Sequence, residues 1–189
     1  MSEKITKQES IGQLGLEVSE DNTEAARRAL DTAASLLLRK LPGRLVNQIR
    51  GTKVFIDNGL TEGGGVANAE EKTILLDSEK NKLSLQKAED YLVQEGYLNQ
   101  GDWTKAIPQQ KDEEWSCLTY QTIHEVGHLV DFLAEGESYK RLEGHHSPTK
   151  YGESGPVEAF AEAFTYWILD QDIDPEADSI INGLMDSYR

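Results

Sequence analysis

The sequence predicts an α+β protein that is mostly helical and carries a small twisted sheet. Apolar residues recur at helical spacing over most of the chain, which is typical of amphipathic helices. Two short segments rich in β-branched and aromatic residues, bounded by glycine-rich turns, predict strands. The length of 189 residues suits one domain with a core of its own.

The charge balance argues against two classes of partner. The chain has 19 Lys and Arg against 34 Asp and Glu, a formal net charge of −15. Such a field repels phosphate backbones and anionic lipids, so we expect neither a nucleic-acid partner nor a membrane partner. No apolar run is long enough to span a bilayer, and residues 1–10 carry no apolar signal segment. We therefore predict a cytoplasmic protein, although the mature form of a secreted protein would look the same.

The N-terminal part of the chain predicts an arm followed by a helix. Residues 1–20 are polar and predict a flexible N-terminal arm, with a single domain over residues 21–189. Asp21 and Glu24 have the spacing of a capping box, which predicts a helix start. The apolar periodicity that follows ends before Pro42.

The middle of the chain predicts two strands joined through glycines. A short helix over residues 45–49 precedes a strand over residues 53–57, and residues 73–76 predict a second strand. The run Gly63-Gly64-Gly65 between them predicts a flexible turn. It does not resemble a phosphate-binding loop, because no Gly-Lys-Ser or Gly-Lys-Thr follows it.

Three helical regions follow. Residues 78–111 predict a helical insert that lies over the surface. Acidic residues 112–114 favour the start of a long helix, where negative charge complements the helix dipole. A further helix is predicted from Gly155-Pro156 to about residue 169, and a last one over residues 176–188.

The sequence His124-Glu125-Val126-Gly127-His128 carries the strongest chemical signal. Histidines four residues apart lie on one face of a helix, where both imidazoles can bind one metal ion. Glu125 lies about 100° further round the helix, beside the metal, where it can accept a proton from a water molecule. The alternative is an ordinary solvated helix face.

A catalytic zinc site needs a third protein ligand. Glu158 and Glu162 lie on one face of the next strong helix, with small alanines between them. We expect Glu158 to be the third ligand and Glu162 to orient a histidine through its other ring nitrogen. The rival ligands are His145 and His146 in a polar loop, and a solvated acidic stripe is the structural alternative.

Two other residues lie near the same helix stripe. Asp131 follows His128 by one turn, and we favour a role as an outer acceptor over that of a surface carboxylate. Cys117 is interpreted as a small core residue rather than a ligand. As the only cysteine, it excludes an internal disulfide.

The block over residues 124–164 resembles one family of metallopeptidases. Tyr151-Gly152 and the run Glu-Ala-Phe-Ala-Glu-Ala-Phe over residues 158–164 resemble the lethal-factor-like zincins, which include the anthrax lethal factor catalytic domain and the Pro-Pro endopeptidases. That family places the histidine motif and an Asp on one helix, and a Tyr seven residues before the liganding Glu. The resemblance implies a zincin-like fold in which one Zn²⁺ is held by His124, His128 and Glu158.

The same resemblance implies a function. Glu125 is expected to be the general base and Tyr151 the tyrosine that stabilises the transition state. The partner is a peptide or protein substrate, aligned along an edge strand for which residues 66–68 and 73–76 are the candidates. A zinc-binding scaffold without catalysis, acting as an interaction protein, is the second hypothesis. A chance motif in a helical protein that binds no metal is the third.

Overall fold

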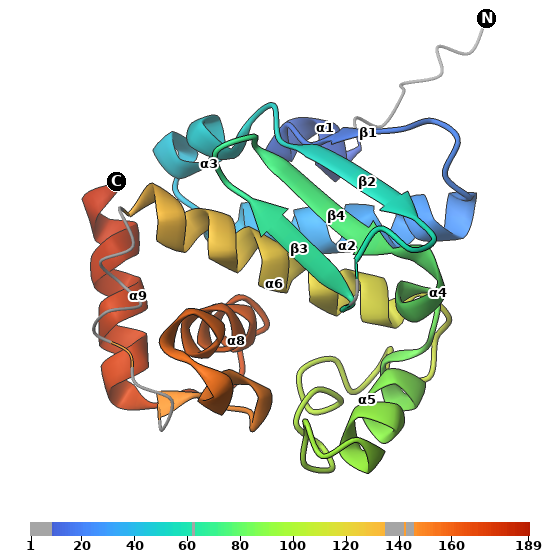
Figure 1. Ribbon diagram of the computed structural model, residues 1–189. Coiled ribbons are helices and arrows are strands. Elements are labelled where there is room, and N and C mark those ends of the chain that lie inside the picture. Colours follow the sequence, from blue (N-terminus) through green and yellow to red (C-terminus); the bar gives the residue numbers. More distant parts are fainter. Residues whose placement is uncertain (1–8, 62, 135–141, 143–145) are drawn as a thin grey trace, which may run out of the picture.

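The chain folds as an α+β structure in which a small sheet packs beside a long helix (Figure 1). The computed structural model describes residues 9–61, 63–134, 142 and 146–189. About half of the chain is helical, and the sheet is a mixed one of four strands among the described residues. The prediction of an α+β class is therefore confirmed.

The strand order of the sheet is β1-β2-β4-β3. β1 (Glu17–Val18), β2 (Lys53–Asp57) and β4 (Thr73–Asp77) run parallel to one another, and β3 (Gly65–Asn68) pairs antiparallel with β4. Of the two candidate edge segments, residues 73–76 therefore lie inside the sheet, and residues 66–68 lie in the strand at its edge.

The N-terminal region differs from the expected arm. Residues 10–18 form α1 (Ser10–Leu14) and β1, with Ile11, Leu14 and Leu16 buried in the core. The three apolar residues sit in a segment too short to show a period, so only packing reveals their role. Residues 1–8 of the predicted arm lie outside the described residues.

The helices that follow match their predicted positions closely. α2 (Glu24–Lys40) and α3 (Gly43–Ile49) bury their apolar faces, and α2 packs on α6. The cap of α2 is different from the expected one, because the side chain of Thr23 accepts the N–H of Ala26 at 3.2 Å. Threonine at this position satisfies the same free N–H groups as a capping box.

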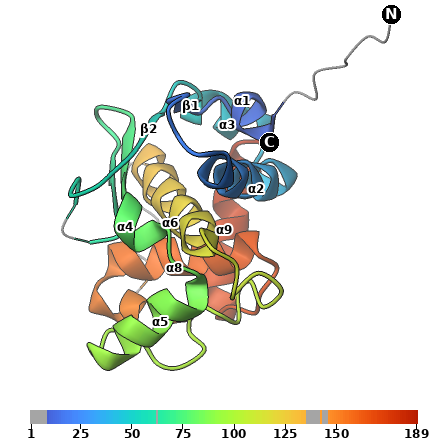
Figure 2. The ribbon, with the colours of Figure 1, turned by 90° about the vertical axis from the view of Figure 1, so that its right-hand side faces the viewer.

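The helical insert predicted over residues 78–111 contributes side chains to the core. α4 (Ser78–Asn81) and α5 (Leu85–Gln94) are followed by a series of turns up to α6, and Leu85, Trp103 and Ile107 of this region are buried. α5 contacts α6, and in Figure 2 it lies below α6 at the bottom of the molecule. The insert therefore has exposed residues as well as buried ones, and its turns carry no periodic signal that predicts which of them are buried.

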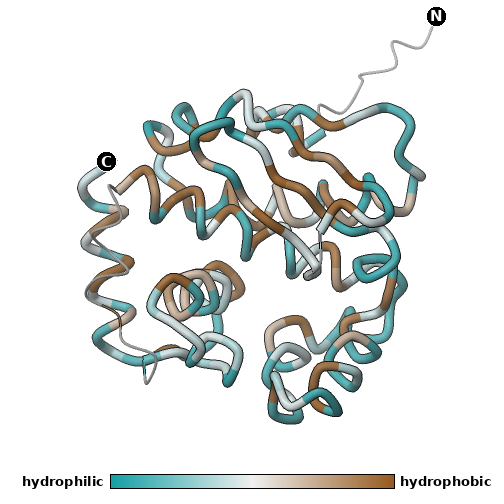
Figure 3. Tube along the Cα trace, in the orientation of Figure 1, coloured by the Kyte–Doolittle hydropathy of each residue, from teal (hydrophilic) through white to brown (hydrophobic). Residues whose placement is uncertain are grey.

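α6 (Ser116–Leu133) is the central helix of the molecule. It begins after the acidic residues 112–114 rather than at them, because the preceding Trp115 has a positive φ of 69°. Most of its residues are buried between the sheet, α2 and α8. Figure 3 shows apolar stretches in α6 and in the strands above it.

The C-terminal helices confirm the predictions made for them. α8 (Pro156–Ile168) follows a short 3-10 helix, η2 (Tyr151–Ser154), and α9 (Pro175–Ser187) ends the fold. α6 and α8 approach closely, since a Cβ on Gly127 would lie 3.3 Å from the Cα of Ala161. Small residues thus allow the two helices to bring their polar side chains together.

Among the described residues, no helix has both the length and the apolar character needed to cross a membrane.

Candidate metal centre

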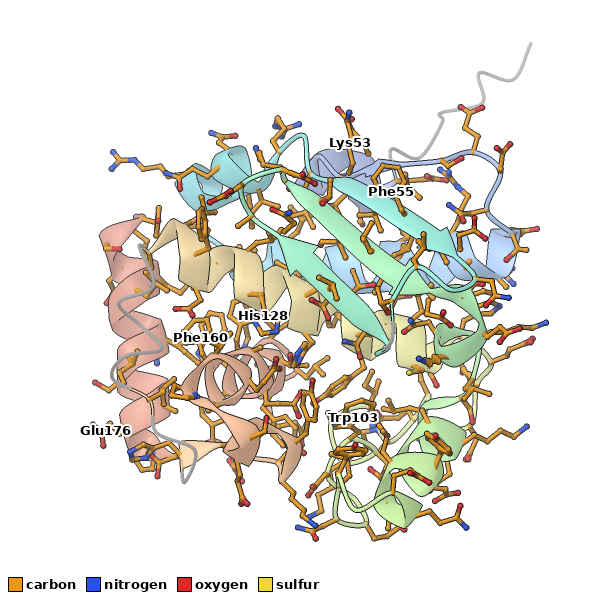
Figure 4. All side chains as sticks on the ribbon, in the orientation of Figure 1. Lys53, Phe55, Trp103, His128, Phe160 and Glu176 are labelled. Atoms are coloured by element: carbon orange, nitrogen blue, oxygen red, sulfur yellow. The ribbon has the colours of Figure 1, made fainter. Side chains whose placement is uncertain are left out.

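Three side chains from α6 and α8 meet at one point. Nε2 of His124 lies 3.2 Å from Nε2 of His128 and 3.0 Å from Oε2 of Glu158, and the distance from His128 Nε2 to Glu158 Oε2 is 3.4 Å. These are the only three His, Cys, Asp or Glu residues grouped in this way among the described residues. Figure 4 shows His128 on the side of α6 that faces α8.

The triangle has dimensions that suit a bound metal ion. In a tetrahedral site with bonds of about 2.0–2.1 Å, neighbouring ligand atoms lie about 3.3–3.4 Å apart. The three observed distances lie around this value. Two imidazole nitrogens and a carboxylate oxygen also form a donor set that divalent transition metals accept. The group can therefore bind a metal ion.

Local sequence explains how the triangle forms. His124 and His128 are one helical turn apart, so their rings project from the same face of α6. Glu158 belongs to the first turn of α8, which begins at Pro156. The close approach of α6 and α8 at Gly127 lets the Glu158 side chain reach both rings.

Glu162 supports His124 from behind. Its Oε1 lies 2.7 Å from Nδ1 of His124, so the contact predicted for this residue is present. Its Oε2 accepts hydrogen bonds from Trp103 Nε1 at 3.0 Å, Tyr120 OH at 3.0 Å and Thr149 OH at 2.5 Å. Glu162 is fully buried, but both of its carboxylate oxygens have hydrogen-bond partners. These partners offset the cost of burying its charge.

The side chains of the cluster are held together by opposite charges. Burial alone lowers the pKa of His124, but hydrogen bonds with Glu158 and Glu162 outweigh it and raise this pKa to about 10. Burial alone raises the pKa of Glu158, but its hydrogen bonds with His124 and His128 bring the pKa far below its ordinary value. A metal ion held by these residues would take the place of the imidazolium as the positive partner of the carboxylate.

Glu125 has an unusual environment. The residue is 2% exposed, and its Oε1 accepts a hydrogen bond from Gln121 Nε2 at 2.8 Å. Its Oε2 is buried and has no hydrogen-bond partner among the described residues. A buried carboxylate oxygen without a partner is costly and indicates a group absent from the protein itself, such as a water molecule or a substrate.

Gln121, which lies near the same helix stripe, and Gly65 are residues of this site to which the sequence prediction gave no role. Gln121 lies one turn before Glu125 on α6, and that spacing was the available signal. A Cβ on Gly65 would lie 2.7 Å from Oε1 of Glu125 and 3.0 Å from Cδ2 of Leu76. Gly65 is therefore no part of a flexible turn: it begins β3, and only a glycine fits against the carboxylate there.

A cavity of about 550 Å³ opens above the cluster. One wall is β3 with the residues that follow it, and the ligand triangle, Glu125, Asp131 and Tyr151 line the rest. The ring centroid of Tyr151 lies 5.9 Å from that of His124. Burial and the negative charges of Glu158, Glu162 and Glu125 raise the pKa of Tyr151 well above its ordinary value. The phenol therefore stays protonated and can donate a hydrogen bond.

Of the two other residues near the helix stripe, one lies at the cavity and one in the core. Asp131 is 3% exposed and lines the cavity. Cys117 is buried, and burial raises the pKa of its thiol to about 12, so it is a core residue as predicted.

The rival ligands do not join the triangle in the described part of the chain. His146 contacts Asp174 at 3.1 Å and Glu176 at 3.3 Å, at the start of α9. Glu176 lies at the outer edge of the molecule, away from His128 (Figure 4). His145 lies outside the described residues.

Comparison with known proteins identifies no relative: no protein-family model, no curated protein and no solved structure matches the chain. The chemistry of the site is therefore inferred from its own geometry.

Proposed function

We propose that this protein is a zinc-dependent endopeptidase in which His124, His128 and Glu158 would hold the metal. The observation that carries the proposal is a His-His-Glu triangle beside a buried carboxylate oxygen, Oε2 of Glu125, that has no partner among the described residues. Three protein ligands with an open position are typical of catalytic zinc. The resemblance to the lethal-factor-like zincins points to the same activity and to a zincin-like fold.

The residues around the triangle suit the hydrolysis of an amide bond. A zinc ion supplies Lewis-acid chemistry, because it acidifies water and polarises a carbonyl group. Glu125 accepts the proton of the attacking water through Oε2 and returns it to the leaving amine. Tyr151 donates its phenolic hydrogen to the oxyanion, and the loss of one such donor typically costs ~10²–10³ in kcat.

The edge strand supports a peptide as the substrate. β3 pairs with β4 on one side, lies at the edge of the sheet and forms one wall of the cavity. Its other side offers backbone N–H and C=O groups to an extended chain that enters the cavity. A peptide bound in this way passes its backbone over the ligand triangle.

The environment of Glu125 favours hydrolysis over a purely metal-binding scaffold. A scaffold needs the three ligands and the support of Glu162, but gains nothing from a buried carboxylate oxygen without a partner. An oxygen left open to a bound water molecule suits a group that accepts a proton from that water during the reaction.

Zinc content and peptide cleavage test the proposal together. We expect one zinc per chain in the wild type and in Glu125→Gln, with cleavage of a peptide library by the wild type and a loss of at least ~100-fold in the variant. Glu158→Ala should lose most of the zinc affinity. The exposed Glu113→Gln is the matched control and should retain both.

The outcomes separate the hypotheses. Full activity in metal-free protein contradicts a metallopeptidase, and turnover retained by Glu125→Gln removes Glu125 as the base. Tight zinc binding without any cleavage identifies the scaffold instead.

A further inference from the structure

The segment between α5 and α6 reaches the candidate metal centre through one side chain, Trp103. The residue is 6% exposed, and its Nε1 donates to Oε2 of Glu162 over 3.0 Å. The other oxygen of Glu162 contacts His124 Nδ1 at 2.7 Å. The Trp103 ring also meets Tyr151 edge-on, with centroids 6.4 Å apart and planes at 77°. Trp103 therefore touches both the carboxylate behind His124 and the tyrosine of the cavity wall.

A buried carboxylate fixes the turn that carries Trp103. Glu89 of α5 is fully buried, and its two oxygens accept the backbone N–H groups of Gly101 at 2.8 Å, Trp103 at 2.7 Å and Thr104 at 2.8 Å. The side chains of Gln100 and Thr104 donate to the same carboxylate. A buried charge with this many donors holds the backbone of the turn in one conformation.

The same turn holds the backbone next to Tyr151. Oδ2 of Asp102 accepts the backbone N–H of Lys150 at 3.0 Å and that of Asn99 at 2.8 Å. The hydroxyl of Tyr166 on α8 donates to the backbone carbonyl of Asp102. The turn is thus attached both to the residue preceding Tyr151 and to the helix that carries Glu158 and Glu162.

From these contacts we infer that Trp103 is a positioning residue of the metal centre. Its indole N–H fixes the Glu162 carboxylate that orients His124, and its ring fixes the position of the Tyr151 ring. The turn over residues 99–104 is the support that sets both groups relative to each other. This inference rests on the proposed function and adds to it a residue that is not among those lining the cavity.

The substitution Trp103→Phe tests the inference, because it keeps an aromatic ring and removes the N–H. We expect the zinc Kd, measured by chelator competition, to rise about 10-fold and kcat to fall about 10-fold, within the range known for residues behind metal ligands. KM should change less than about 2-fold, since the group acts on the reacting centre rather than on substrate binding. The visible absorption of the Co²⁺-loaded protein should also change.

Trp167→Phe is the matched control. Trp167 lies on α8, and Lys40 Nζ sits 4.6 Å from its ring centroid. Its replacement removes an indole from another part of the fold and leaves the contacts of Glu162 in place, so zinc affinity, kcat and the Co²⁺ spectrum should stay at wild-type values.

A double-mutant cycle with Glu162→Gln tests the route of the effect. If Trp103 acts through Glu162, Trp103→Phe should change zinc affinity much less in the Glu162→Gln protein than in the wild type. Equal changes in both proteins overturn the inference. So does a Trp103→Phe protein with wild-type zinc affinity and kcat, or one whose only defect is a lower Tm.

A second replacement keeps the test open if Trp103→Phe does not fold. A single-site replacement of the indole by benzothiophene preserves the ring shape and removes only the N–H, and the same changes are expected. A wild-type protein that binds no zinc and cleaves no peptide overturns the proposed function itself. A wild type that binds zinc and cleaves peptide, together with a Trp103 variant of the same zinc affinity and kcat, overturns only the positioning role.

Discussion

Glu162 Oε1 lies 2.7 Å from His124 Nδ1, and both side chains are almost completely buried. Because Nδ1 is engaged, Nε2 is the nitrogen of His124 that faces His128 and Glu158. The contact therefore selects the tautomer that a metal ligand needs and holds the ring in place.

Glu162→Gln should weaken metal binding without removing a ligand. An amide oxygen accepts a hydrogen bond from the His124 N–H less strongly than a carboxylate does. The amide NH₂ group is itself a donor, so it cannot accept the hydrogen bonds that Tyr120 and Thr149 now donate to Glu162. We expect the zinc Kd to rise by about 10–100-fold, measured by competition with a chelator. The exposed Glu113→Gln should bind zinc like the wild type, and an unchanged Kd in Glu162→Gln would contradict the role of this carboxylate.

Gly65→Ala should impair catalysis while leaving the metal in place. The new Cβ would lie 2.7 Å from Glu125 Oε1, so either β3 or the carboxylate must move. Because the three ligands do not touch Gly65, zinc affinity should stay within about 2-fold, whereas kcat should fall by at least about 10-fold. A Cβ on Gly63 meets nothing within 4 Å, so Gly63→Ala is the control that should keep wild-type kcat.

Gly127→Ala and Gly183→Ala should change stability in opposite directions. A Cβ on Gly127 would lie 3.0 Å from Phe164 Cδ1 and 3.3 Å from the Ala161 backbone, and such overpacking costs roughly 1–3 kcal/mol. On α9 a Cβ at Gly183 meets nothing within 4 Å, so alanine there should stabilise the helix by about 0.5–1 kcal/mol. Urea unfolding measures both, and a stabilised Gly127→Ala would show that α6 and α8 are not closely packed there.

Cys117 should report the opening of α6. Burial raises the pKa of its thiol from 9.0 to about 12, so the unfolded chain loses this proton first and the free energy of unfolding should fall as the pH rises from about 9 to about 12. Below pH 9 the contribution of Cys117 to the free energy of unfolding is constant. Urea unfolding at several pH values measures this change, and Cys117→Ser should show a smaller fall in stability between pH 9 and pH 12.

Ellman's reagent should label the thiol of the native protein only when the protein unfolds.

Bound zinc should slow the labelling of Cys117, because the thiol and two of the proposed ligands share α6. At a free zinc concentration 100 times the Kd, the stabilisation is about 2.7 kcal/mol, or roughly a 100-fold slower reaction. Labelling at the same rate with and without zinc would show that α6 opens independently of the metal centre.

The sequence alone determined the parts of the site that depend on local spacing. His124 and His128 share a helix face because they are one turn apart, and the same rule pairs Glu158 with Glu162 on α8. The bounds of β2, α8 and α9 were also predicted closely, since strong periodicity and Pro or Gly signals mark them.

Only the tertiary structure decided which distant segments complete the site. Trp103 reaches Glu162, Gly65 packs on Glu125, and residues 10–18 join the core instead of forming an arm. These contacts join residues far apart in the chain, and they depend on how helices and strands pack rather than on any repeat within a segment. Residue spacing encodes which side chains share a face, but it does not encode what that face meets.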